Sequence, residues 1–149
     1  VLLAAVAAAV HASLQSHQAN QESADVAQTI RFVFDRISRE VRTAAAVDAA
    51  SGVLTILPPA GGDVTQTKYL YTNGRLYYYR TDGTGTHAHV LLESTDTVVL
   101  TGFSVTPQYG EDWEGTTCTK SVRIRVDFQV DGRAQALVAS AAPRRNQLY

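Results

Sequence analysis

The stretch VLLAAVAAAVHASLQSHQANQESADVAQTIRFVFDRISREVRTAAAV, at residues 1–47, decides the fold of this chain. It contains no proline and no glycine, and good helix formers such as Leu, Ala, Gln, Glu and Arg supply most of it. We therefore expect one helix from Val1 to Val47, roughly 70 Å long at 1.5 Å per residue. Such a helix is longer than a domain of this size needs, so most of its first half must pack against something outside the chain's own core.

The start of this helix is apolar on every side. Each residue from Val1 to Val10 is Val, Leu or Ala, which suits lipid or a tightly packed helical bundle. Ten residues cover about 15 Å, whereas a membrane-spanning helix needs about 20 residues, and the sequence has no Met, so we expect further residues upstream. A cleaved signal peptide is disfavoured because the helical pattern runs on. The residues expected to anchor the chain and assemble into a bundle are Val1, Leu2, Leu3, Val6, Val10 and Leu14.

The second half of the helix is amphipathic. Large apolar residues recur at i, i+3, i+4 and i+7 spacing, with charged residues largely around them, which predicts a stripe that packs on a layer of the same chain. The stripe comprises Val26, Ile30, Val33, Phe34, Ile37 and Val41. We therefore divide the chain into a membrane or filament part, residues 1–25, and a globular domain, residues 26–149.

Composition limits the remaining possibilities. The 149 residues, 45% of them hydrophobic and with a net charge of -1, fit one folded domain, and the bulk charge does not indicate a nucleic-acid partner. A single cysteine, Cys118, excludes an internal disulfide and a zinc site built from several cysteines.

From Asp48 onward the hydrophobic period changes from 3.6 to 2. We expect the helix to end in residues 49–52, where Gly52 can take the left-handed C-terminal position. Val53–Leu57 is expected to form a short strand, and Lys68–Arg80 a hairpin around Asn73-Gly74, because Asn-Gly suits a two-residue turn. In that register Tyr71 faces Leu76, Tyr69 faces Tyr78 and Leu70 meets Tyr77.

Further strands are expected near His89–Leu92 and Thr97–Val105, and the most regular one at Ser121–Val130, where Arg123 and Arg125 point to solvent. Asp131-Gly132 then turns the chain into a strand at Ala134–Ala139. The segment Thr106–Thr119, between the strands expected at Thr97–Val105 and Ser121–Val130, is predicted to be an irregular loop. We expect its residues Tyr109, Glu111, Asp112 and Trp113 to contact a partner or cargo. The predicted class is α+β: a long N-terminal helix packed on an antiparallel sheet of about six or seven strands.

Chemistry by a metal or a nucleophile has little support in the sequence. His87 and His89 share one strand face, but a third metal ligand could only come from Asp82 or Glu93. The acidic residues Glu111, Asp112 and Glu114 lack the ligand alternation of a calcium loop, and no nucleophile-elbow motif is present. We expect no enzyme activity, no metal and no cofactor.

Nucleic-acid binding is the second non-enzymatic alternative. Arginines and tyrosines that combine phosphate contact with base stacking are found at Arg75, Tyr77, Tyr79, Arg80, Arg123 and Arg125. Asp127 shares the face of Arg123, and the domain is not basic, so we regard nucleic acid as an unlikely partner.

The order of these features resembles the type IV pilin superfamily, especially the J-type minor pseudopilins of type II secretion and PilW-like minor pilins. The resemblance covers nearly the whole chain and rests on the apolar run Val1–Val10 followed by IRFVFDRISREVR at Ile30–Arg42, YLYTNGRLYYY at Tyr69–Tyr79, VVLTGFSVTPQYGEDW at Val98–Trp113, SVRIRVDFQVDG at Ser121–Gly132, and PRRN at Pro143–Asn146. Two family features are missing. The processing site, a glycine followed by phenylalanine with glutamate five residues into the mature protein, lies outside these residues, and Cys118 alone cannot close the two-cysteine loop of many major pilins.

The resemblance implies assembly. A single-pass subunit of the bacterial inner membrane, with its domain in the periplasm or on the cell surface, would be cut by a prepilin peptidase. It would then join other minor and major pilins or pseudopilins through its helix, at the tip of a secretion pseudopilus or pilus. Secreted cargo is a further implied partner. The alternatives are a DNA-uptake pilin and a membrane-tethered binding domain.

Overall fold

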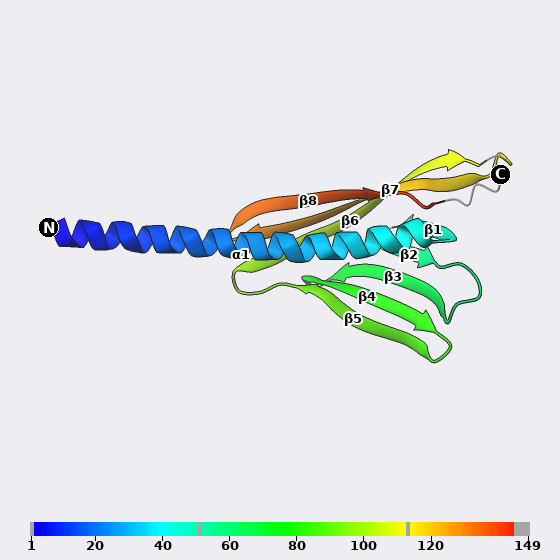
Figure 1. The fold of residues 1–149 in the computed structure, drawn as a ribbon, viewed down its shortest axis with the longest axis horizontal. Coiled ribbons are helices and arrows are strands. Elements are labelled where there is room, and N and C mark those ends of the chain that lie inside the picture. Colours follow the sequence, from blue (N-terminus) through cyan, green and yellow to red (C-terminus); the bar gives the residue numbers. More distant parts are fainter. Residues whose placement is uncertain (1, 51, 113, 145–149) are drawn as a thin grey trace.

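The computed structural model describes residues 2–50, 52–112 and 114–144. One helix, α1 (Leu2–Thr43), runs most of the length of the molecule, and two antiparallel sheets flank its C-terminal half (Figure 1). The α+β class is therefore confirmed. The strands number eight in these residues and form two sheets, so the expectation of a single sheet of six or seven strands was wrong.

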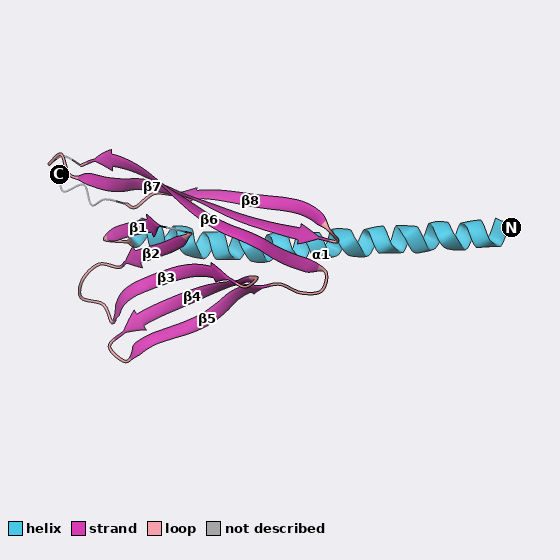
Figure 2. Cartoon of the chain, turned by 180° about the vertical axis from the view of Figure 1, so that it is seen from behind, coloured by secondary structure: helices cyan, strands magenta, loops and turns pink. Residues whose placement is uncertain are grey.

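The first sheet has the order β1-β2-β3-β4-β5, so each strand pairs with the next in the chain. Its strands are β1 (Ala46–Ala50), β2 (Val53–Leu57), β3 (Val64–Thr72), β4 (Arg75–Asp82) and β5 (Gly85–Glu93). The second sheet has the order β6-β7-β8, with β6 (Val98–Glu111), β7 (Thr117–Val130) and β8 (Arg133–Ala141). Figure 2 shows the two sheets diverging on either side of the helix.

The helix ends at Thr43, four residues before Val47 and before the end expected in residues 49–52, so that expectation was wrong. The alanines there favour a helix, but the N–H of Ala45 donates to the carbonyl of Leu57 at 2.8 Å, and β1 pairs with β2 along its whole length. Val47 and Ala49 are buried as alternate residues of this strand. Gly52, expected to cap the helix, lies in the β1–β2 turn with a φ of 77°. Burial and strand pairing have overridden the intrinsic helix propensity.

Both predicted tight turns are confirmed. Asn73 and Gly74 have φ angles of 51° and 73°, and the strands around them pair Tyr71 with Leu76, Tyr69 with Tyr78 and Leu70 with Tyr77. Asp131 and Gly132 have φ angles of 48° and 74° between β7 and β8. Positive φ at both central positions is what a two-residue hairpin requires.

The segment Thr106–Thr119 is a hairpin end and not an irregular loop, so that expectation was wrong. Tyr109 and Glu111 belong to β6, and β7 begins at Thr117. Pro107 is tolerated because β6 is an edge strand of its sheet, where a missing N–H costs no ladder bond. A Cβ on Gly110 would lie 2.7 Å from Cγ of Lys120, so the glycine lets that side chain cross the strand.

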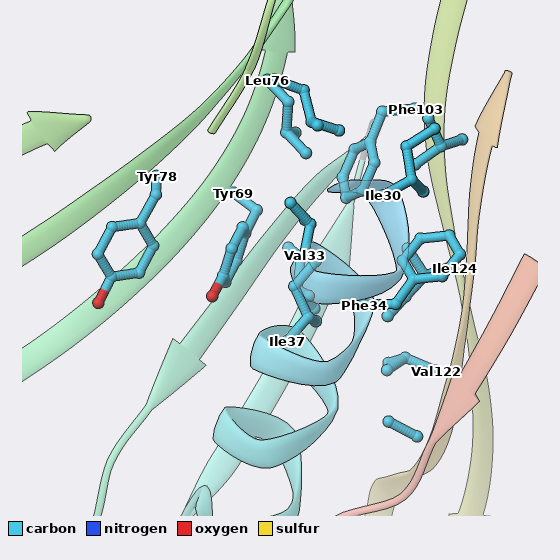
Figure 3. Packing of buried hydrophobic residues seen from close by; sticks show 14 of the residues in the cluster. Ile30, Val33, Phe34, Ile37, Tyr69, Leu76, Tyr78, Phe103, Val122 and Ile124 are labelled. Atoms are coloured by element: carbon cyan, nitrogen blue, oxygen red, sulfur yellow. The ribbon is translucent and has the colours of Figure 1, made fainter. Parts of the chain in front are cut away.

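The core lies where the helix meets both sheets. Ile30, Ile37 and Val41 are fully buried, Val33 and Phe34 nearly so, and Val26 is half-buried at the margin, which confirms the predicted packing stripe. Figure 3 shows Val33 and Ile37 between Tyr69 and Tyr78 of the first sheet and Val122 and Ile124 of the second. One helical face therefore joins two sheets into one domain.

Candidate assembly surface on the helix

The N-terminal half of α1 extends beyond both sheets (Figures 1 and 2). From Val6 to Gln21, every side chain that the structure describes is exposed. Among the described residues, the first hydrogen bond from the helix to a sheet joins Ser23 Oγ to Oε1 of Gln135 on β8, at 3.3 Å. The helix between Val6 and Gln21 is about 24 Å long at 1.5 Å per residue. Its later turns line an open hollow of about 380 Å³ with the β7–β8 turn, through Ala12, Gln15, Ser16 and Asn20, whereas Val6, Val10 and Leu14 are not among the lining residues.

Large apolar side chains are exposed on this rod. Val6, Val10 and Leu14 are 54%, 54% and 58% exposed and follow one another at i, i+4 and i+8. Three of the six predicted anchor and assembly residues are therefore shown to be accessible. Val1 lies outside the described residues, and the side chains of Leu2 and Leu3, although these residues belong to α1, are not described.

Phe32 extends the apolar row along the part of the helix that packs on the sheets. It is 66% exposed and lies 18 residues after Leu14, which is about five turns, so both side chains project in the same direction. It is about 200° around the helix from Ile30, on the side opposite the core. Phe32 was not predicted as a site residue, because only the buried stripe was followed. The signal that could have found it is a large apolar residue two positions after Ile30, on the opposite side of the helix.

A polar cluster holds the C-terminal half of the helix on β3 and β4. Glu40 Oε1 accepts from Nε of Arg36 at 3.3 Å, and Glu40 Oε2 accepts from the hydroxyl of Thr67 at 3.0 Å. The guanidinium of Arg36 lies 3.9 Å above the ring of Tyr78. Burial, together with the Glu40 carboxylate, raises the pKa of Tyr69, which therefore stays neutral here. These contacts fix how the projecting rod is held against the domain.

The predicted partner loop lies at the opposite end of the molecule. Tyr109 is 61% exposed and Glu111 is exposed, both at the end of β6. The carboxylate of Asp112 accepts from the backbone N–H groups of Glu114 (3.0 Å) and Thr116 (2.8 Å), so it closes the turn. Trp113 lies outside the described residues. A hollow of about 710 Å³ beside this turn is lined by residues that include Asp112, Cys118 and Arg144.

The histidine pair lies on β5, with both side chains on one face, as expected. His87 Nε2 is 3.6 Å from Oδ1 of Asp82, while Glu93 pairs with Arg75. Within the described part of the chain, no three His, Cys, Asp or Glu residues are placed to hold a metal ion. Asp82 accepts from the hydroxyl and the N–H of Thr84, and these bonds lower its pKa.

The arginines and tyrosines weighed for nucleic-acid binding do not form one surface. Arg75 and Arg80 lie on β4, whereas Arg123 and Arg125 lie on β7 in the other sheet. Ion pairs join Arg80 to Asp82 at 3.6 Å and Arg125 to Asp127 at 2.6 Å. The rings of Tyr77 and Tyr79 are 6.1 Å apart and half-buried. Acidic partners occupy much of the positive charge that a phosphate backbone would need.

Comparisons with known proteins identify no relative of this chain. A scan of protein-family models and searches of curated proteins and solved structures gave no match. Among the described residues, no helix combines the length and the hydropathy required to cross a membrane.

Proposed function

We propose that this chain is a structural subunit of a filament, assembled through its N-terminal helix, of the kind represented by J-type minor pseudopilins and PilW-like minor pilins. The observation that carries the proposal is the row of exposed Val6, Val10 and Leu14 on a helix that has left its own domain. Burying one Val or Leu side chain fully is worth about 1.5–3 kcal/mol. A row of such residues exposed to water therefore favours binding of a partner that buries them.

The architecture suits a structural subunit whose helix sets the position of its globular domain, and not a catalytic one. Arg36, Glu40 and Thr67 fix the helix to β3 and β4, and the stripe from Ile30 to Val41 fixes it to both sheets. A helix without glycine or proline bends little, so a neighbour that grips residues 6–14 also orients the globular domain. In this proposal the partners are other pilin or pseudopilin subunits, and before assembly the apolar start of the helix lies in the bacterial inner membrane.

The opposite end of the molecule is the place proposed for cargo or a tip partner. Tyr109 and Glu111 are exposed there, and Asp112 borders the hollow between the hairpin end and the end of the helix. This end is separated from the projecting rod by the full length of the domain (Figure 1). A tip subunit could therefore bind neighbours and cargo at the same time.

The N-terminus of the native protein tests the proposal. The protein is isolated from membranes, and intact mass and terminal peptide sequencing define where it begins. We expect an N-methylated aromatic residue about a dozen positions before Val1, followed by a glutamate at the fifth position, which is the product of a prepilin peptidase. A terminus at Val1 or an ordinary signal-peptidase cut would contradict filament assembly and leave a secreted or membrane-tethered binding domain.

A further inference from the structure

The outer edge of the first sheet is open. Strand β5 is its last strand, and no described element lies beyond it (Figure 2). The opposite edge strand, β1, is covered, because the hydroxyl of Thr119 on β7 donates to the carbonyl of Val47 at 3.0 Å. By contrast, all side chains from Gly85 to Val90 on β5 are exposed. The edge of β5 is thus accessible to another strand.

The register shows which backbone groups face outward. Asp82 pairs with Gly85, Arg80 with His87 and Tyr78 with His89, around the two-residue turn Gly83-Thr84. In a two-residue hairpin the closing pair is hydrogen-bonded and the pairs then alternate, so His87 and His89 bond to β4. The residues between them, Thr86, Ala88 and Val90, direct their N–H and C=O groups away from the sheet. They present a template for a further strand.

From Gly85 to Val90 this edge lacks most of the features that usually prevent pairing, and the register shift at Leu91 lies just beyond this segment. Protein edge strands are commonly guarded by lysine, other charges, proline or a covering loop. From Gly85 to Leu92 the sequence GTHAHVLL contains no proline and no Lys, Arg, Asp or Glu. In the second sheet, edge strand β6 contains Pro107, and edge strand β8 begins with Arg133 and contacts Ser23 of the helix through Gln135.

We propose that β5 pairs antiparallel with β5 of a second copy of this chain, about a two-fold axis at Ala88. In this register Ala88 lies opposite Ala88 of the copy, Thr86 opposite Val90, and His87 opposite His89. The smallest side chain meets itself at the axis, and β-branched residues face each other beside it, which is a favourable cross-strand pair. Such a two-fold contact is self-complementary and joins the two sheets into one.

Charge favours a second copy as the occupant. Glu93, the charged residue nearest the paired segment, lies opposite Gly83 of the copy in this register, so no two carboxylates meet, while His87 lies opposite His89 of the copy. An acidic or basic peptide would find no opposite charge between Gly85 and Leu92 to select it. The contact uses a sheet edge and not the helix, so it does not depend on the proposed filament function.

Single cysteines introduced into the full chain test the register, in a Cys118→Ser background that removes the native thiol. Under mild oxidation, we expect Ala88→Cys to give a disulfide-linked dimer of twice the 16.1 kDa mass, because the two Cα atoms lie about 5.5 Å apart in a hydrogen-bonded pair. Thr86→Cys and Val90→Cys should each remain monomeric alone and should cross-link when mixed. Cross-linking of each single variant as efficient as that of Ala88→Cys, or none from Ala88→Cys, would overturn the proposal.

A charge at the axis provides an independent test by sedimentation of the full chain. Ala88→Lys places two ammonium groups opposite each other and should shift the dimer to monomer, whereas Ala136→Lys, at an exposed alanine on β8, should not. Circular dichroism establishes that both variants are folded. Equal association of Ala88→Lys and the unsubstituted chain would overturn the proposal. Both tests are repeated with Val6, Val10 and Leu14 replaced by Gln, so that association through the helix cannot imitate the β5 contact.

Discussion

The two halves of α1 obey different rules, although they form one continuous helix. In the C-terminal half, Ile30, Ile37 and Val41 are fully buried between two sheets, and charged residues occupy much of the remaining surface beside the exposed Phe32. In the N-terminal half, Val6, Val10 and Leu14 are more than half exposed. Apolar residues in the first half therefore cannot be explained by the stability of this domain. The difference separates residues that fold the chain from residues available for assembling it.

The largest expected effect contrasts two phenylalanines of the same helix. Phe34→Ala should reduce the free energy of unfolding by about 3–5 kcal/mol, because its ring is 7% exposed and its removal leaves a cavity between the sheets. Phe32→Ala, at a site 66% exposed, should change it by less than about 0.5 kcal/mol. Urea unfolding of both variants measures the contrast. Equal losses would show that the outer face of the helix also supports the fold.

A smaller loss is expected when the polar cluster is removed. Glu40→Ala leaves Arg36 and the 7%-exposed Thr67 without their shared acceptor and should cost about 1–2 kcal/mol. Asp35→Ala, on the exposed side of the same helix, serves as the matched control and should cost less than about 0.5 kcal/mol. Denaturant midpoints of the two variants measure the difference between these two losses of stability. If Glu40→Ala were as stable as its control, the cluster would not hold the helix on β3 and β4.

Replacing the exposed row should separate assembly from folding. The triple substitution Val6→Gln, Val10→Gln and Leu14→Gln should leave the free energy of unfolding of the domain within about 0.5 kcal/mol, because these side chains are already in water. It should abolish association of the chain with other filament subunits. Thermal unfolding and co-purification from native membranes provide the two readouts. A strong loss of stability, or normal association, would contradict the division between the halves.

The pH dependence of the free energy of unfolding should arise in the first sheet and not in either half of the helix. Thr84 lowers the pKa of Asp82 below its ordinary value, so this carboxylate stabilises the fold above about pH 4, and the stabilisation is lost as pH falls through the lowered pKa. Thr84→Val should remove part of this stabilisation, because it deletes the hydroxyl that donates to Asp82. Urea midpoints of variant and unsubstituted chain should differ at pH 7 and converge in acid. A difference that persists unchanged in acid would assign the effect of Thr84 to packing.

Local patterns predicted those parts of the fold that local chemistry decides. The stripe from Val26 to Val41, the Asn73-Gly74 turn and the alternation along Ser121–Val130 all follow from helical or strand periodicity and from turn geometry. The helix end was misplaced because Thr43–Val47 is alanine-rich, and only pairing with β2 makes its end a strand.

Non-local features were beyond those patterns. In the linker between the two sheets, the hydroxyl of Ser94 donates to the carbonyl of Gly74 and accepts from the N–H of Leu100, and neither contact is visible in a local pattern. The second part of β6 was mispredicted as a loop because it contains Pro107 and Gly110. The edge position that tolerates the proline and the Lys120 side chain that crosses at the glycine are visible only in three dimensions. Of the candidate site, Val6, Val10 and Leu14 could be predicted from hydrophobicity, whereas Phe32 needed the orientation of the buried face.

Photocross-linking from the projecting half of the helix tests the central claim most directly. A photoreactive residue is placed at Leu14 of the full chain in its native cells, with the exposed residue Asp63 of the β2–β3 loop as the control position. We expect covalent adducts between Leu14 and the helices of other filament subunits, lost when Val6 and Val10 are replaced by Gln, and no such adducts from Asp63. The absence of protein adducts at Leu14, or equal adducts from both positions, would contradict an assembly surface on this helix.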